Sequence, residues 1–137
     1  MLVGVRMMNY ENIVELLLME FPRIKKEDAY DDDLLDLPHC VFGIVFVSYV
    51  VKLCKNRNDS ILIKVGEFLE RMALSEDVNV RNVLEVSVLE SLVYDDDYNL
   101  IKGDLKHYLK ELTLKEIQYW EKGRFNKGYV VISNDDN

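Results

Sequence analysis

The chain has 137 residues, 49% hydrophobic and 31% charged, with 25 acidic against 17 basic side chains and a formal net charge of −8. This composition excludes a disordered chain and fits one folded domain. The acidic excess argues against binding to nucleic acid or to anionic membranes, because proteins bind both mainly through Lys and Arg. If the acidic surface binds a partner, the partner is expected to be a basic protein. The alternative is that the negative charge only keeps the protein soluble.

The first periodic segment, residues 10–21, predicts an amphipathic helix with apolar residues at three- and four-residue steps. Asn9 is a candidate N-cap, and Pro22 is a stop signal. Residues 23–37 are expected to form a polar connection with at most a short helical turn. That connection contains the first of two runs of three aspartates, each led by a tyrosine: Tyr30, Asp31, Asp32 and Asp33.

The most apolar segment spans residues 38–55. Its valines and aromatics favour a strand and its length favours a helix, but no second segment of similar weight is present to pair with it as a strand. We therefore predict a central helix that is apolar nearly all round. Its apolar run, residues 41–51, has 11 residues, whereas a membrane span needs about 20.

A cytoplasmic location is expected from the cysteines and from the N-terminus. On one helix, Cys40 and Cys54 would lie about 21 Å apart, and a disulfide needs Cα atoms within about 7 Å. Two unpaired thiols suit a reducing compartment. The first ten residues lack the basic start and long apolar stretch of a signal peptide.

The second half of the chain predicts further helices over residues 61–74 and 80–93, and a weaker one over 100–112, loosened by Gly103. Thr113 and Glu116 form a capping-box pattern, which predicts a restart of a short helix that ends at Gly123.

The predicted fold is all-α: a compact bundle of five or six helices with a short extended tail. We place a single helical domain at residues 1–125 and an extended or disordered tail at 126–137. Within the tail, residues 128–133 are β-prone.

The second aspartate run, Asp95 to Asp97 after Tyr94, partly resembles the loop of a calcium-binding EF-hand. Asp95, Asp97 and Asn99 match its first ligand positions, but Leu100 stands where glycine is needed and Lys106 where the bidentate glutamate is needed. We expect no metal and no cofactor.

Catalytic motifs are missing from the sequence: it has no phosphate loop, dinucleotide fingerprint or nucleophile elbow. We predict that the protein is not an enzyme. The alternative is an active site assembled from scattered carboxylates and histidines, which requires a deep pocket that holds His39 or His107 beside an acidic group.

Residues 77–81 resemble the Asp-x-x-Val-Arg start of the second helix of a HEAT repeat. In this resemblance, residues 61–74 and 80–93 form the helical hairpin, Asp77 caps its second helix and Val80 enters the core. Only one such unit is found, although HEAT repeats stack in several copies. The resemblance implies an adaptor or regulatory scaffold that binds a protein or peptide in a groove beside the hairpin.

In overall character the chain resembles the small acidic immunity proteins of bacterial toxin systems, including contact-dependent inhibition. The resemblance rests on small size, acidity and helical pattern, and no motif carries a residue across. It implies a protein that neutralises a cognate toxin, often a basic nuclease. Tyrosine beside aspartate suits a basic, partly apolar partner surface, whereas the alternative is a solvated loop. The predicted contact residues are Tyr30, Asp31, Asp32, Asp33, Tyr94, Asp95, Asp96, Asp97 and Tyr98.

Overall fold

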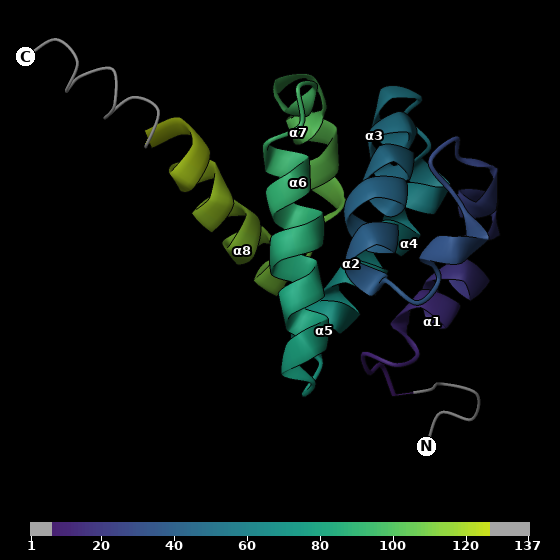
Figure 1. Ribbon diagram of the computed structural model, residues 1–137. Coiled ribbons are helices and arrows are strands. Elements are labelled where there is room, and N and C mark those ends of the chain that lie inside the picture. Colours follow the sequence, from purple (N-terminus) through teal and green to yellow (C-terminus); the bar gives the residue numbers. More distant parts are fainter. Residues whose placement is uncertain (1–6, 127–137) are drawn as a thin grey trace, which may run out of the picture.

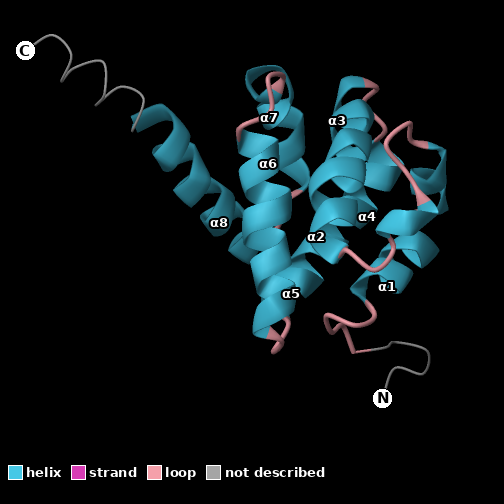
Figure 2. Cartoon of the chain, in the orientation of Figure 1, coloured by secondary structure: helices cyan, strands magenta, loops and turns pink. Residues whose placement is uncertain are grey.

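Six helices pack around one core in the computed structural model, which describes residues 7–126 (Figure 1). No strand occurs within those residues, so the all-α prediction is confirmed (Figure 2). The β-prone residues 128–133 lie outside the described range. The α-helical elements are α1 (Ile13–Glu20), α2 (Pro38–Cys40), α3 (Val47–Lys55), α4 (Asp59–Leu74), α5 (Val78–Asn82), α6 (Glu90–Val93), α7 (Tyr98–Tyr108) and α8 (Glu111–Glu121).

Three of the six helices contain a π-helical stretch. Val41–Phe46 joins α2 to α3 in one helix, and Val83–Leu89 joins α5 to α6 in another. The two stretches pack against each other where Gly43 faces Ser87: a Cβ at Gly43 would lie 3.2 Å from the Ser87 carbonyl oxygen. A third π-helical turn, Lys122–Asn126, extends α8 beyond the predicted end at Gly123.

The helix Pro38–Lys55 lies in the core, as predicted. It is long and apolar enough to cross a membrane by length and composition, and 61% of it is buried inside the bundle. Phe42 and Phe46 are fully buried, and each packs against aromatic rings of other helices. Such burial accounts for its composition, since a helix apolar all round needs neighbours on most sides.

The start of α1 is held by two asparagines. The Asn9 side chain accepts a hydrogen bond from the backbone amide of Asn12 at 3.0 Å, and the Asn12 side chain accepts one from the amide of Asn9 at 2.9 Å. This reciprocal pair is the arrangement of a capping box. Asn9 therefore closes the turn before α1, whereas the N-cap of α1 itself is Asn12, because regular α-helix begins at Ile13 and not at residue 10.

The predicted hairpin of residues 61–93 forms from α4 and the continuous helix 78–93. The Asp77 side chain accepts from the backbone amide of Asn79 at 2.9 Å, and Val80 is fully buried. Asp77 also accepts from the amide of Tyr10 at 2.9 Å, which ties the segment before α1 to this turn. This helical hairpin is one part of the all-α bundle of residues 7–126.

The predicted capping box before α8 is wrong. α8 begins at Glu111, so Thr113 lies inside its first turn and is fully buried. The carboxylate of Glu70, on α4, takes the place of the cap: it accepts from the backbone amides of Leu112 and Thr113, each at 3.1 Å, and from the Thr113 hydroxyl at 2.8 Å. A carboxylate at a helix N-terminus also opposes the positive end of the helix dipole.

Candidate functional site

The second aspartate run lies in the connection between α6 and α7, and most of its side chains already have partners. Asp97 pairs with Lys55 of α3, with 2.5 Å between Oδ2 and Nζ. Asp95 accepts from the backbone amide of Asp97 at 2.8 Å. Asp96 and Tyr94 are exposed, and the Tyr94 side chain is 48% exposed. These last two remain available to a partner.

Tyr98 is fully buried, which corrects its prediction as a contact residue. It is the first residue of α7, and its hydroxyl donates to Glu121 of α8 at 2.6 Å. Burial, followed by that hydrogen bond, raises the pKa of Tyr98. The sequence spacing could have indicated this burial, because Tyr98, Ile101 and Leu105 share one helical face, and all three are buried.

The first aspartate run is exposed along its whole length. Asp31, Asp32 and Asp33 form part of a 3-10 turn, Asp32–Leu34, whose N-cap is Asp31: its side chain accepts from the Asp33 amide at 2.9 Å. The Tyr30 hydroxyl donates to Asp32 at 2.8 Å, while its ring is partly buried against the core. Within residues 7–126, the three aspartates form no ion pair with Lys or Arg.

Beside this run, a groove of about 430 Å³ lies between α1 and the segment 30–37. Val14, Leu18 and Met19 of α1 face Leu35 across it. The Met19 side chain is 65% exposed and Leu35 is 36% exposed, so apolar surface is open to solvent here. The charged residues that line the groove are Glu11, Glu15 and Lys25.

The arrangement is therefore an apolar groove with acidic surroundings, and we call it the α1 groove. Glu15 of α1 and Glu11, which precedes α1, line it, while Asp31, Asp32 and Asp33 precede its lining residue Leu35 in the sequence. The sequence predicted the aspartates but not the groove, because Met19 and Leu35 become neighbours only in the tertiary structure. The flexible side chain of an exposed methionine can adapt its shape to a protein partner.

The two aspartate runs flank the same helix. Glu27, three residues before Tyr30, pairs with Lys52 of α3 at 3.0 Å, and Asp97 pairs with Lys55 of α3. Figure 1 shows the segment before α2 on one side of α3 and the α6–α7 connection on the other. A single partner would have to reach across α3 to contact both runs.

The histidines do not form the pocket that the enzyme alternative requires. His39 and His107 are both exposed, and His39 Nδ1 shares a hydrogen bond of 2.5 Å with the Ser87 hydroxyl. Cys54 is buried, and this burial raises the pKa of its thiol to about 11, which keeps it protonated and unreactive. Within residues 7–126 no group of three His, Cys, Asp or Glu side chains is placed to hold a metal ion.

In a comparison with protein families, residues 14–121 match the model of a domain of unknown function, DUF7674. The match covers most of the chain, and the chain belongs to this family. No curated protein and no solved structure matches the chain.

Proposed function

We propose that this DUF7674 chain is a binding protein that neutralises a basic toxin domain, and that the α1 groove receives an apolar segment of that toxin. The observation that carries the proposal is the open apolar surface of Met19 and Leu35, together with an exposed run of aspartates that forms no ion pair within residues 7–126.

The apolar part of the groove supports the affinity of such a complex. Exposed Met and Leu side chains lose water contact when a partner covers them, at about 25 cal/mol per Å² of apolar area. Leu37, two residues after Leu35, is also 50% exposed. An apolar centre with a charged rim is the usual anatomy of a protein interface.

The acidic part supports fast association and the choice of a basic partner. Because Asp31, Asp32 and Asp33 have no cationic neighbour within ion-pair distance among residues 7–126, their field acts on solvent and on an approaching partner. Rim charges of this kind act mainly on the association rate and its salt dependence.

A growth-rescue assay tests the proposal. The probe is the C-terminal domain of a large secreted protein encoded immediately upstream of this chain in its source genome, expressed in a bacterial host with or without the chain. We expect growth arrest by the domain alone and rescue by the chain. Absence of such a gene, or failure of the chain to rescue, contradicts the toxin-neutralising function.

The same assay tests the first aspartate run with two matched variants. Replacing Asp31, Asp32 and Asp33 by asparagine removes three charges but keeps oxygen acceptors for the Asp33 amide and the Tyr30 hydroxyl. We expect this triple variant to rescue poorly. The control triple variant Glu67→Gln, Asp104→Asn and Glu111→Gln removes three exposed charges elsewhere and should rescue fully.

A second candidate function, peptide binding by an adaptor, is favoured by a cleft of about 640 Å³ at the turn between α4 and α5. Met7, Met8 and Leu74 supply its apolar lining, with Leu74 65% exposed. If this cleft binds the partner, Leu74→Asp should abolish binding and the aspartate variants should not.

A further inference from the structure

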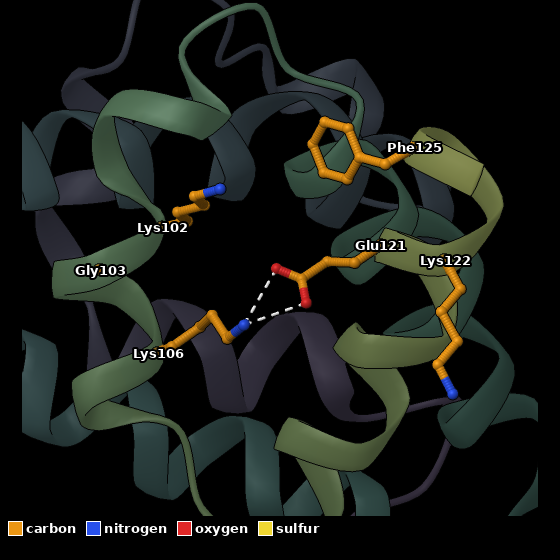
Figure 3. Close-up of a pocket in the computed structure, with 6 residues that line it drawn as sticks. All are labelled: Lys102, Gly103, Lys106, Glu121, Lys122 and Phe125. Atoms are coloured by element: carbon orange, nitrogen blue, oxygen red, sulfur yellow. Dashed lines mark hydrogen bonds and ion pairs between the residues drawn. The ribbon is translucent and has the colours of Figure 1, made fainter. Parts of the chain in front are cut away.

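Two tyrosines are buried among residues 7–126, and only one of them has a partner for its hydroxyl. The Tyr98 hydroxyl donates to Glu121, which also pairs with Lys106 of α7 (Figure 3). Tyr49 of α3 is 7% exposed, yet its hydroxyl forms no hydrogen bond with any of these residues. Because a buried hydroxyl without a partner costs free energy, the Tyr49 hydroxyl indicates a position at which a ligand can bind.

Tyr49 lines a cleft of about 480 Å³ where the 3-10 turn Pro22–Lys26, α3 and the start of α4 meet. Arg23 of the turn and Glu27, which follows it, line the same cleft. Burial raises the pKa of Tyr49, the charge of Arg23 lowers it and the charge of Glu27 raises it. The hydroxyl therefore lies within reach of both charges. Its raised pKa keeps it protonated at neutral pH, so it can donate a hydrogen bond.

The charged residues of the cleft leave one positive charge without a partner. Lys52 and Glu27 pair with each other at 3.0 Å. Glu27 also accepts from the Ser48 hydroxyl at 3.2 Å, so its carboxylate is satisfied. Arg23 is exposed and forms no ion pair with any residue in the described range 7–126. The cleft thus has a net positive charge in a protein of net charge −8, which favours an anion with a single charge.

Neutral donors line the α4 side of the cleft, and they come from Asn56, Asn58 and Ser60. Asn58 is the N-cap of α4, and its side-chain oxygen accepts from the Ile61 amide at 3.3 Å and from the Ser60 hydroxyl at 3.2 Å. These bonds leave the NH2 group of Asn58 as a donor. The N-terminus of this 16-residue helix also favours negative charge, so this wall suits an anion with a further hydrogen-bond acceptor.

The remaining lining residues are apolar and limit the kind of anion. Leu53 of α3 is 7% exposed and Ile61 of α4 is half-buried, so both offer contact to a short hydrocarbon chain. The planar guanidinium of Arg23 can bind a carboxylate through two parallel hydrogen bonds. A phosphate group carries more than one negative charge at neutral pH, whereas a carboxylate carries one. A carboxylate with an apolar chain therefore matches the cleft better than a phosphate.

We propose that this cleft binds a small monocarboxylate with an amide group and a short apolar chain, the chemistry of an N-acylated apolar amino acid. Arg23 and the Tyr49 hydroxyl hold the carboxylate. Asn58 donates to the amide oxygen, and the apolar chain lies against Leu53 and Ile61. The volume of about 480 Å³ lies within the range of small-ligand sites. The cleft shares no lining residue with the α1 groove, so this site is independent of the proposed toxin binding.

The test is an NMR titration of the full chain with N-acetyl-L-leucine in a buffer free of phosphate. We expect saturable shifts of the amides of residues 22–27 and 49–61, with a dissociation constant below about 10 mM. Two further ligands are titrated separately: N-acetyl-L-leucinamide, which lacks the negative charge, and inorganic phosphate, which lacks the apolar chain. Each should bind at least about tenfold more weakly, since each offers only part of the recognition.

Three variants assign the binding to the cleft. Arg23→Gln should weaken binding of N-acetyl-L-leucine at least about tenfold. Tyr49→Phe should weaken it at least about fivefold without lowering the free energy of unfolding, because the hydroxyl has no partner among residues 7–126. Lys26→Gln removes an exposed lysine of the same 3-10 turn that does not line the cleft, and this variant should bind as the unmodified chain does.

The proposal is overturned if no saturable shift occurs, if the amide or inorganic phosphate binds as tightly as N-acetyl-L-leucine, or if Tyr49→Phe binds it as the unmodified chain does. A loss of stability in Tyr49→Phe equal to that in Tyr98→Phe would also overturn it, because the Tyr49 hydroxyl would then have a partner in the folded chain.

Discussion

Glu70 and Thr113, 43 residues apart in sequence, are joined by two hydrogen bonds: the carboxylate of Glu70 accepts from both the backbone amide and the hydroxyl of Thr113. This relationship places the first turn of α8 on α4.

Glu70→Ala removes the acceptor for three donors at the start of α8. We expect the free energy of unfolding to fall by about 1–3 kcal/mol, since capping donors are left without a partner. Urea denaturation followed by circular dichroism measures this. Glu67→Ala, on the exposed face of the same helix, is the control and should change stability little. Equal losses in the two variants would contradict a capping role for Glu70.

The same contact predicts a pH dependence. Burial raises the pKa of Glu70, but the hydrogen bonds from Leu112 and Thr113 lower it by more, so its pKa in the folded protein lies below 4.5. Because the unfolded chain binds this proton more readily, the stabilisation is complete above about pH 4.5 and is lost as the pH falls through the lowered pKa.

Thermal melts of the chain and of Glu70→Gln between pH 3 and 7 measure this contribution. We expect the stability difference between the two proteins to be largest near neutral pH and to shrink below about pH 4.5. A difference that stays constant with pH would show that the charge of Glu70 does not contribute.

Two glycines in helices give opposite predictions. A Cβ at Gly66 would lie 2.0 Å from the Tyr108 carbonyl oxygen, so α4 and the end of α7 must separate to admit it. Gly66→Ala should cost about 2–3 kcal/mol of stability, as overpacked sites do. Gly103→Ala, which meets no atom within 4 Å, should stabilise the protein by about 0.5–1 kcal/mol. Denaturation curves of the two variants measure both changes in the free energy of unfolding. A destabilising Gly103→Ala would contradict the open space found around this position.

The buried tyrosine at the start of α7 yields a further matched pair. Tyr98→Phe deletes the hydroxyl that donates to Glu121 at 2.6 Å within the core, and should cost about 1.5–3 kcal/mol, as for hydrogen bonds to charged groups. Tyr108→Phe deletes a hydroxyl that donates to Asp59 at the surface, also at 2.6 Å, and should cost less. Chemical denaturation of both variants shows which one loses more stability. A larger loss for Tyr108→Phe would contradict the stronger contribution expected of the Tyr98 hydrogen bond.

The sequence predicted the helices well where periodicity was strong. The central helix 38–55 and the α4 to α6 hairpin form as expected, because their apolar stripes specify both the element and its buried face. The cap of α8 was mispredicted, since Thr113 has a local capping-box pattern but bonds to a residue that only the tertiary structure brings near.

The candidate site residues were also predictable only in part. Exposure of the first aspartate run was predictable from composition, but its pairing with an apolar groove was not, because Met19 and Leu35 belong to different elements. Tyr98 was assigned to the surface from the Tyr-Asp-Asp-Asp-Tyr pattern, although its helical spacing to Ile101 indicates burial.

The most direct test of the binding function is the association rate between the purified chain and the upstream toxin domain, measured at low salt and at about 0.15 M ionic strength. If the exposed aspartates steer a basic partner, the rate of the unmodified chain falls several-fold with salt. The variant with asparagine at Asp31, Asp32 and Asp33 then associates more slowly at low salt and depends less on salt. Identical rates and identical salt dependence for the two proteins would contradict the account.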